Sequence, residues 1–380
     1  MSDIIIIGAG ISGLSLAHSL RNSDLDITVL ERGSIGAGTT GKSIACFGWY
    51  PLYNGIDLKL ASRSWDVYSP LIDDGDLSYH RNGLLETATT EAAFDSLAHS
   101  VSVLAENDIP AETLHPPAVR DHHVDPAVAS AGAAFYPTVG RLDPGEILGY
   151  FARAAEGDGV TIRTENEVTD VVADGGRVLG LETTAGQMSA DVVVNAAGPW
   201  APNVAEMVGL SLPVVHSRAP ISVLETSDNF DLPTVILDDG FYLTGEQSAT
   251  VLVGHAPQES DEDLSTAAAR LGAPGTVEGT GIGSVTESHR IRVAERAPRA
   301  VPKLEDATLA NEWQGVRCHS PDGRPLVGPT AVDGFYLLAG MSGWGITYGP
   351  ACGELLADHL VTGSWPPEMA ALRPDRGFDD

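Results

Sequence analysis

Lysine is nearly absent from this sequence. Only three lysines (Lys42, Lys59 and Lys303) occur among 380 residues, and 22 Lys+Arg against 52 Asp+Glu give a formal charge of −30. A nucleic-acid-binding face needs clustered cations to neutralise phosphates, so this balance disfavours nucleic acid as a partner. Acidic, lysine-poor surfaces suit proteins kept soluble in concentrated salt, where screening suppresses self-repulsion. We therefore expect a halophilic protein, with an ordinary acidic cytosolic enzyme as the alternative.

Cysteine and long apolar runs are also scarce. The three cysteines (Cys46, Cys318 and Cys352) are widely separated and odd in number, which excludes a disulfide framework and a metal knuckle. The histidines show no metal-ligand spacing, so we expect no metal. The first apolar run, residues 4–7, is too short for a signal sequence or a membrane span. We expect a cytoplasmic protein without an integral membrane segment.

The first thirty residues read as strand, turn, helix and strand. Residues 4–7 are four isoleucines, typical of a central parallel strand covered on both faces. A glycine-rich turn at residues 8–13 leads into a helical pattern that fades by Asn22, and residues 26–31 alternate like a second strand that ends on Glu31. This order is that of a dinucleotide-binding unit, with a purely structural βαβ turn as the alternative.

Each glycine of this turn has a distinct task. Gly8 makes the tight turn, Gly10 lets the backbone reach a pyrophosphate, and Gly13 lets the helix pack on the strand. The free N–H groups at the helix start would hold the anion. Glu31 is placed to accept the ribose hydroxyls and would repel a 2′-phosphate, which disfavours NADP. A second run of the same spacing, residues 36–41, has no helical pattern after it and is predicted to be a loop.

Further motifs follow along the chain, and together they carry a family resemblance. In order they are the glycine turn with Glu31, Thr39-Thr40-Gly41-Lys42-Ser43, Gly140-Arg141-Leu142-Asp143-Pro144, residues 195–200, Trp313-Gln314-Gly315-Val316-Arg317, Ser320-Pro321-Asp322-Gly323, and residues 340–347. Over nearly the whole chain this series resembles the D-amino-acid oxidase (DAO) family of FAD-dependent amine and amino-acid oxidoreductases. That family includes glycine oxidase, sarcosine oxidase and the D-amino-acid dehydrogenases.

The resemblance implies FAD, noncovalent or covalent, rather than NAD, and we expect the unlinked form because of the position of Cys318. One branch attaches flavin through a cysteine in the general region of Cys318, but at an earlier position. The residues implied in cofactor binding are Gly8, Ala9, Gly10, Ile11, Ser12, Gly13, Glu31, Arg32, Thr39, Thr40, Lys42, Ser43, Val168, Ala197, Gly198, Gly343, Trp344, Gly345, Ile346 and Thr347. Of these, residues 343–347 would present N–H groups and a helix N-terminus to the flavin pyrimidine, where negative charge develops on reduction.

The resemblance also implies a substrate site. Arg317 would pair with a substrate carboxylate through two parallel hydrogen bonds, a geometry that guanidinium suits. The Tyr242 hydroxyl would reach the same carboxylate, and Arg218 would be a further active-site cation. The structural alternatives are a surface or interdomain salt bridge for Arg317 and a core position for the tyrosine.

The function expected from these residues is oxidation of the C–N bond of an amino acid or N-methyl amino acid, by hydride transfer to flavin N5. The sarcosine oxidase branch activates oxygen with a substrate-domain lysine, whereas this chain has none between Lys59 and Lys303. A dehydrogenase with an unknown electron acceptor is therefore expected rather than a fast oxidase. The alternatives are an FAD-dependent 2-hydroxy-acid oxidoreductase and a non-catalytic FAD-binding redox sensor.

The expected fold is α/β, a Rossmann-like FAD-binding domain with a mixed, mostly antiparallel-sheet substrate domain. The FAD-binding domain is expected to be discontinuous, with residues 1–75, 140–215 and 305–380. Residues 76–139 and 216–304 would form the substrate-binding domain. Short strands at residues 219–224, 234–237 and 250–254, separated by turn residues, indicate the antiparallel sheet.

Overall fold

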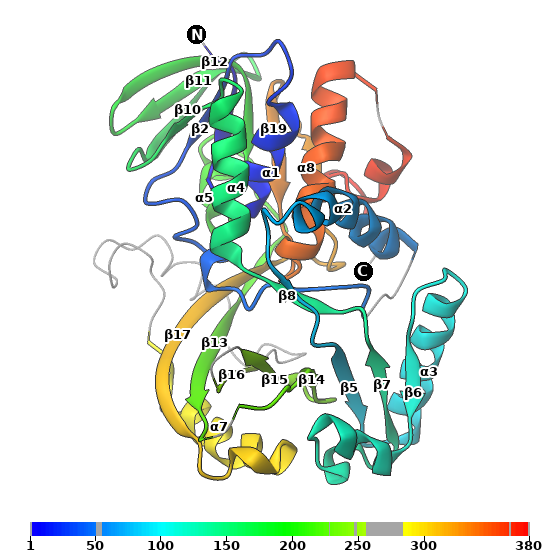
Figure 1. Cartoon of the computed structure of the whole chain (residues 1–380). Helices are drawn as coiled ribbons and strands as arrows, with labels where there is room; N and C mark the ends of the chain where they lie inside the picture. Colours follow the sequence, from blue (N-terminus) through cyan, green and yellow to red (C-terminus); the bar gives the residue numbers. More distant parts are fainter. Residues whose placement is uncertain are drawn as a thin grey trace.

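The computed structural model describes residues 2–50, 55–227, 229–246, 249–255, 284–364 and 366–378. Two eight-stranded sheets and one three-stranded sheet organise this part of the chain. In Figure 1 the first large sheet and its helices form the upper half, the second large sheet lies in the lower half, and β8 runs between them. The expected α/β architecture with a second, mostly antiparallel sheet is confirmed.

The first large sheet has the order β10-β11-β12-β1-β2-β9, with β19 beside β12 and β18 beside β19. Its bounds are β1 (Ser2–Ile7), β2 (Ile27–Leu30), β9 (Thr161–Arg163), β10 (Val168–Asp174), β11 (Arg177–Thr183), β12 (Gly186–Asn195), β18 (Leu326–Pro329) and β19 (Phe335–Ala339). Strands β19, β12, β1, β2 and β9 run parallel, and β10, β11 and β18 pair antiparallel to their neighbours.

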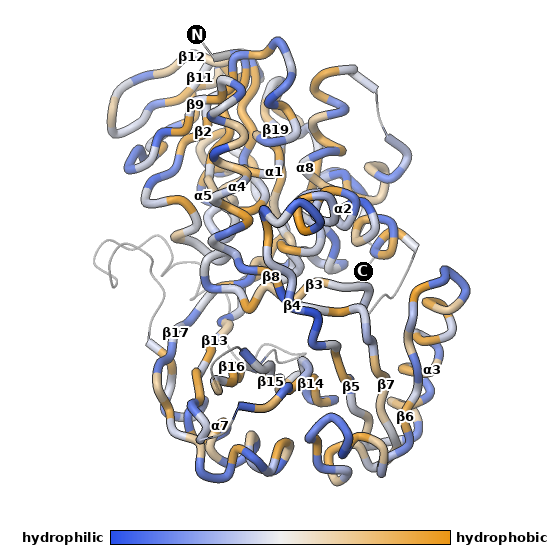
Figure 2. The backbone as a smooth tube through the Cα atoms, viewed as in Figure 1, coloured by the Kyte–Doolittle hydropathy of each residue, from blue (hydrophilic) through white to orange (hydrophobic). Residues whose placement is uncertain are grey.

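Both faces of β1 are covered, which explains its four consecutive isoleucines. Ile4 and Ile6 pack with the helices, while Ile5 and Ile7 pack in a separate core on the other face. The helices of the first face are α1 (Ile11–Leu20), α2 (Gly55–Asp73), α4 (Pro144–Gly157) and α8 (Gly345–Thr362), and α5 (Ala201–Glu206) contributes to the second. Figure 2 shows hydrophobic residues gathered along these strands and inner helices.

The second large sheet has the order β17-β13-β16-β15-β14-β5-β7-β6. Its bounds are β5 (Leu84–Ala88), β6 (Glu112–Leu114), β7 (Gly132–Tyr136), β13 (Val215–Glu225), β14 (Thr234–Ile236), β15 (Phe241–Glu246), β16 (Thr250–His255) and β17 (Thr308–His319). All pairs are antiparallel except β14 with β5. Two helices accompany this sheet, α3 (Glu91–Ala105) and α7 (Glu287–Ala300).

A small sheet of β3 (Cys46–Phe47), β8 (Gly140–Leu142) and β4 (Tyr79–His80) carries the chain between the two halves. We keep the division into a cofactor-binding and a substrate-binding domain as a proposal. In that proposal residues 308–319 move to the substrate-binding side, because β17 pairs along its length with β13. Residues 256–283 of the expected substrate domain lie outside the described residues.

Helix α8 begins at Gly345 and continues through Pro350, earlier than the apolar pattern from residue 350 suggests. Proline has no N–H to donate to the carbonyl one turn back. The Tyr68 hydroxyl of α2 donates to that carbonyl, Ile346 O, at 2.9 Å, and the Ala351 N–H donates to Ser64 Oγ at 3.0 Å. Two buried α2 side chains thus replace the bonds that the proline disturbs.

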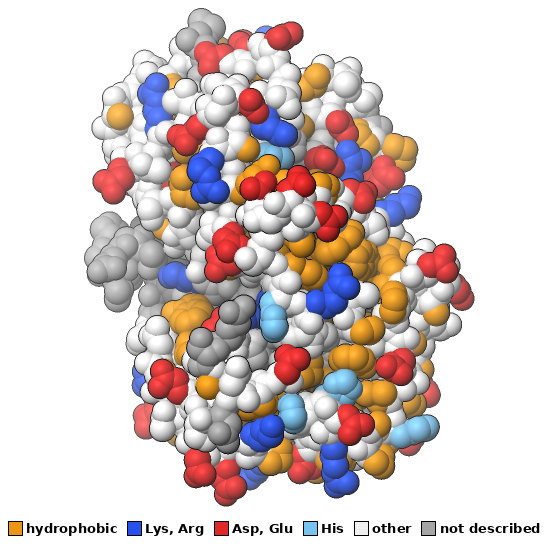
Figure 3. Space-filling model, viewed as in Figure 1, with side chains coloured by type: hydrophobic (Ala, Val, Ile, Leu, Met, Phe, Trp, Pro, Cys, Tyr) orange, Lys and Arg blue, Asp and Glu red, His pale blue; other side chains and the backbone are white. Residues whose placement is uncertain are grey.

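The surface is acidic, as its composition requires. On the face drawn in Figure 3, acidic side chains are scattered over both halves, and Lys and Arg form no large continuous area among the coloured residues. No helix within the described ranges is long and apolar enough to cross a membrane. The same part of the chain contains no group of three or more His, Cys, Asp or Glu side chains arranged to hold a metal ion.

Candidate active site

A cavity of about 680 Å³ opens where β1, β2 and β12 end, at the carboxyl edge of the first large sheet. Ligands of open parallel sheets bind at this edge. The cavity is lined by Gly8, Gly10, Ile11, Ser12, Glu31, Arg32, Thr39, Thr40, Val168, Ala197 and Gly198, all of which the sequence predicted, together with Ile7, Leu30, Asn166, Pro199, Trp200, Val204 and others. Ala9 and Gly13 belong to the same turn without lining the cavity.

The glycine turn is as tightly packed as its sequence suggests. Gly8 has φ +107°, and a Cβ there would lie 2.6 Å from Ala196 O. A Cβ at Gly13 would lie 1.9 Å from Gly8 O. A side chain at Gly8 would push the glycine turn away from Ala196, and a side chain at Gly13 would push α1 away from the end of β1. The cavity wall therefore depends on both glycines.

The N-terminus of α1 faces this cavity as an anion site. Gly10 caps the helix without a side-chain hydrogen bond, and no acidic residue lies in the first turn. Thr40, from the 3-10 turn Thr40–Lys42, accepts a hydrogen bond from the Ile11 N–H at 3.1 Å. The positive end of the helix dipole therefore remains available to a negatively charged ligand.

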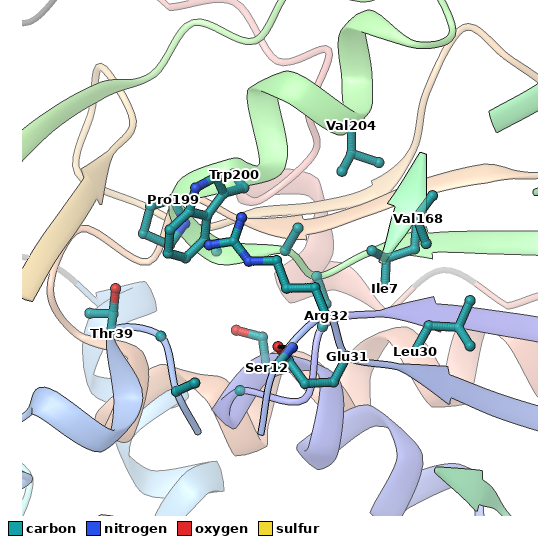
Figure 4. A pocket seen from close by; sticks show the side chains of 18 of the residues that line it. Ile7, Ser12, Leu30, Glu31, Arg32, Thr39, Val168, Pro199, Trp200 and Val204 are labelled. Carbon is teal, nitrogen blue, oxygen red and sulfur yellow. Dashed lines mark hydrogen bonds between the residues drawn. The ribbon is translucent and has the colours of Figure 1, made fainter. Parts of the chain in front are cut away.

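Glu31 joins the turn to the end of β2. Its Oε2 accepts from Ala9 N at 3.0 Å and its Oε1 accepts from Gly33 N at 2.9 Å. Arg32 extends across the cavity, and its guanidinium lies over the Trp200 ring at 3.9 Å (Figure 4). Apolar side chains form the end of the cavity beyond Glu31: Ile7, Leu30, Val168 and Val204 (Figure 4).

These features fit the adenosine pyrophosphate part of FAD. The apolar end suits a purine, Glu31 can accept ribose hydroxyls, and the α1 N-terminus suits a pyrophosphate. The remaining predicted cofactor residues, Lys42, Ser43 and residues 343–347, do not line this cavity. Lys42 and Ser43 follow Thr40 toward β17, where Lys42 O accepts from the Trp313 indole N–H at 3.0 Å. Burial lowers the pKa of the Lys42 ammonium.

The second glycine-rich turn lies against the end of β17. Gly343 has φ +89°, and a Cβ there would lie 3.1 Å from Arg317 Cδ. The Ser342 N–H donates to Cys318 O at 2.9 Å. Helix α8 then begins with no side-chain cap and no acidic residue in its first turn. A second helix N-terminus thereby meets the sheet that carries Arg317.

Arg317 and Tyr242 come together on one face of the second sheet. Tyr242 pairs with Gly254, Gly254 with Ile221, and Ile221 with Trp313, so their side chains share a face. Arg317, four residues beyond Trp313, points to the same side and hydrogen-bonds the Tyr242 hydroxyl. Burial raises the pKa of Tyr242 despite the opposing effect of the Arg317 charge, so the phenol stays protonated.

Strand alternation places two other candidates on the opposite face. Arg218 pairs with Val316, and Cys318 pairs with His216, one residue out of step with Arg317. The structure therefore does not bring Arg218 together with Arg317 and Tyr242. Burial raises the pKa of the Cys318 thiol to about 12, so the thiolate that nucleophilic attachment needs is disfavoured.

Two residues to which the sequence assigned no functional role lie on the same face as Arg317. His319 Nε2 lies 2.7 Å from Ser217 Oγ, and burial, with the Arg317 and His216 charges, lowers its pKa to about 4. Glu86 pairs with Ile236, which pairs with Tyr242, so its side chain also points to this face. In the sequence, Glu86 is marked only as the single charged residue of the segment LLETA, and this is not a motif.

The fold and site define a class of protein. A parallel sheet with a dinucleotide cavity at its glycine turn adjoins an antiparallel sheet that presents Arg317 and Tyr242 beside a second glycine-rich turn. The family model described as "FAD dependent oxidoreductase" (DAO) matches residues 3–359, and the chain belongs to this family. FAD is the cofactor of that family, in agreement with the cavity.

Individual relatives agree with this assignment. The chain is 26% identical to the glycine oxidase of Geobacillus kaustophilus, over 94% of this chain and 92% of the relative. It is 27% identical to the human mitochondrial dimethylglycine dehydrogenase over 99% of its own length, but it spans only 44% of that protein. The crystal structure of L-proline dehydrogenase from P. horikoshii superposes with a TM-score of 0.85 at 21% identity, covering 98% of this chain and 96% of that one, and shares the fold.

Proposed function

We propose that this chain oxidises the carbon–nitrogen bond of an α-amino acid or N-methyl amino acid, with noncovalent FAD. The observation that carries the proposal is the position of Arg317, which contacts the Gly343 turn and hydrogen-bonds Tyr242. A carboxylate bound by this pair would lie beside the second glycine-rich turn. The glycine oxidase and dimethylglycine dehydrogenase relatives support the same substrate class.

FAD, when bound, supplies the acceptor for the two electrons that leave the substrate. Glu31 and the N-terminus of α1 would hold its adenosine pyrophosphate part, and the N-terminus of α8 would face its other end. The chain's own contribution is binding and orientation. The Arg317 guanidinium offers two parallel donors to a carboxylate, and the protonated Tyr242 hydroxyl offers a third.

Holding the carboxylate at two side chains fixes the orientation of the substrate α-carbon. Orientation of this kind can supply a large part of a rate enhancement, because the bound reactants no longer lose translational and rotational freedom in the reacting step. The proposed reaction needs no side-chain nucleophile. Arg218, on the other face of the sheet, has no part in it.

We propose further that electrons pass to an acceptor other than oxygen. The support is the absence of lysine between Lys59 and Lys303. The substrate-reduced holoenzyme should be reoxidised faster by an artificial quinone acceptor than by air-saturated buffer. Lys42 is the lysine near β17, since its Cβ lies 3.6 Å from the position that a Cβ at Gly315 would take. The variant Lys42→Met tests whether this lysine affects reoxidation by air. A cytoplasmic location belongs to the same proposal, supported by three free cysteines.

Anaerobic reduction of the holoenzyme by a panel of amino acids, N-methyl amino acids, 2-hydroxy acids and simple amines tests the function. Arg317→Ala should lower the efficiency of flavin reduction by the reactive acid about 100-fold or more, because a desolvated carboxylate loses its charge-assisted partner. Arg317→Lys should recover only part of the loss, since an ammonium cannot make the planar two-point contact. Reduction by the corresponding amine, if that amine reacts, should hardly change.

Other results would overturn the proposal in distinct ways. An equal loss for acid and amine, with normal FAD content, would make Arg317 a structural residue. Reduction by 2-hydroxy acids alone would assign the rival oxidoreductase activity. A protein that binds FAD but is reduced by no member of the panel would be a flavin-binding sensor.

A further inference from the structure

Glu86 is a half-buried acid that the proposed reaction does not use. It lies in β5, where it pairs with Ile236 of β14, and Ile236 pairs with Tyr242 of β15. Directly paired residues of neighbouring strands point to the same face, so Glu86 and Tyr242 share the face that presents Arg317. Two strand spacings, about 10 Å, separate their backbones.

Among the residues that the structure describes, none offers Glu86 a positive charge that affects its pKa. The Tyr136 hydroxyl of β7 donates a long hydrogen bond of 3.4 Å to Glu86 Oε2, and within the described part of the chain Glu86 forms no ion pair. Tyr50, which follows β3, is the other titratable group close by: burial, the Cys46 thiol and the Glu86 charge keep its pKa well above the usual value. Tyr50 is therefore a neutral hydrogen-bonding group.

This environment is costly for a carboxylate. Burial raises the pKa of Glu86 to about 7, and the Tyr136 hydrogen bond opposes the shift only in part. Even so, the Glu86 side chain is only half-buried, whereas its strand neighbours Leu85 and Thr87 are buried. A partly desolvated carboxyl group that a ligand can still reach, and that has no cation beside it, suits a cationic ligand. Such a ligand would supply the missing charge-assisted hydrogen bonds.

We propose that Glu86 binds a second, positively charged group of the substrate, so that the preferred substrates are α-amino acids whose side chain ends in an ammonium or guanidinium group. This inference rests on the proposed function, because Arg317 and Tyr242 hold the carboxylate at the other end. The substrate then lies along the sheet face, with its carboxylate where the Arg317 guanidinium meets the Tyr242 hydroxyl over β16 and its cationic end toward β5. A neutral side chain of equal length would leave Glu86 without a cationic partner.

The first experiment uses holoenzyme and unreactive probes. Each of 6-aminohexanoate and hexanoate is titrated while the flavin absorbance spectrum is followed, and the two dissociation constants are compared. Wild-type protein should bind the aminated probe at least about 30-fold more tightly. Glu86→Gln, which keeps the shape and removes the charge, should abolish this preference. Glu112→Gln, an exposed change in β6 of the same sheet, should leave it intact.

The second experiment is anaerobic flavin reduction by 2,4-diaminobutyrate, ornithine, lysine and arginine, each compared with norleucine in both enantiomers. Wild-type protein should show an optimum at one side-chain length, and Glu86→Gln should lower the basic-to-neutral ratio at that length at least about 30-fold. Glu86→Asp keeps the charge but shortens the side chain, so the optimum should move to a longer substrate.

Two results would overturn the inference and are distinguishable from failure of the proposed function. If norleucine and lysine reduce the wild-type flavin alike and Glu86→Gln leaves their ratio unchanged, the protein is an amino-acid oxidoreductase in which Glu86 binds no substrate cation. If neither probe preference nor side-chain optimum exists but Arg317→Ala still abolishes reduction, the conclusion is the same. Reduction by no amino acid at all would instead remove the proposed function.

Discussion

Gly254 decides where Tyr242 can lie. A Cβ at Gly254 would be 2.2 Å from Tyr242 Cζ and 2.3 Å from its hydroxyl oxygen, so the tyrosine ring occupies the space of the missing side chain. The ring passes over β16 toward Arg317 only because residue 254 is glycine. A residue with no motif around it thus controls the position of a predicted site residue.

Gly254→Ala should displace the Tyr242 ring and weaken carboxylate binding. We expect a roughly 10-fold to 100-fold lower efficiency of flavin reduction by the reactive acid, the value of one buried hydrogen bond to a charged group. FAD content should remain normal, because the cofactor cavity lies in the other sheet. Gly157→Ala, at a position where a Cβ meets nothing within 4 Å, is the control. Wild-type efficiency in Gly254→Ala would show that the Tyr242 hydroxyl is dispensable.

Glu86 also predicts a pH dependence of stability. Its folded pKa of about 7 lies above the usual 4.5, so the folded state favours the protonated acid. The contribution of Glu86 to the free energy of unfolding is full below about pH 4.5. It is lost as the pH rises through 7, because the carboxyl must then ionise in a partly desolvated position. Glu86→Gln removes this penalty and should raise the melting temperature by a few degrees at pH 8, at roughly 2 °C per kcal/mol, and hardly at all at pH 4.5. A difference that does not change with pH would contradict this pKa.

At the scale of elements, Glu31 connects β2, the glycine turn and the cavity. Its carboxylate already accepts two backbone N–H groups, from Ala9 and Gly33, and remains on the cavity wall. Glu31→Ala removes these two bonds and the expected ribose acceptor. Arg317 and Tyr242 lie in the second large sheet, so the loss should concern cofactor binding rather than substrate recognition.

We predict that Glu31→Ala weakens FAD binding about 10-fold to 100-fold, measured by titrating apoprotein with FAD. In the holoenzyme that remains at saturating FAD, the dissociation constant of the acid substrate should be close to that of wild type. Unchanged FAD affinity would refute the assignment of Glu31 to the cofactor.

At the scale of the whole molecule, net charge dominates the solution behaviour. The net charge is −30, and the repulsion between surface charges extends over about 30 Å at 0.01 M ionic strength but over only about 3 Å at 1 M. Removing salt therefore exposes the folded chain to its own repulsion, and the melting temperature should rise by several degrees between these salt concentrations. A series in NaCl, with KCl as a check for ion-specific effects, measures this. A melting temperature independent of salt would contradict the halophilic interpretation and leave the FAD assignment untouched.

The sequence by itself determined the cofactor half of this protein. The strand of four isoleucines, the turn at residues 8–13 and Glu31 are close together in the chain, and local geometry decides their arrangement. Eleven predicted residues line the cavity, and most of them directly follow the carboxyl ends of β1, β2 and β12 at one edge of the sheet. The order of motifs along the chain also indicated the family to which the protein belongs.

Only the tertiary structure decided which side chains face the candidate substrate site. Side chains alternate along a strand, and the face that each one takes depends on a register between strands that are far apart in the sequence. That register brings Arg317 to Tyr242 across β13 and β16 and turns Arg218 to the opposite face. It also aligns Glu86 with Tyr242 through Ile236. No local pattern specifies pairing between residues so distant in the chain, because it arises from packing of the whole sheet.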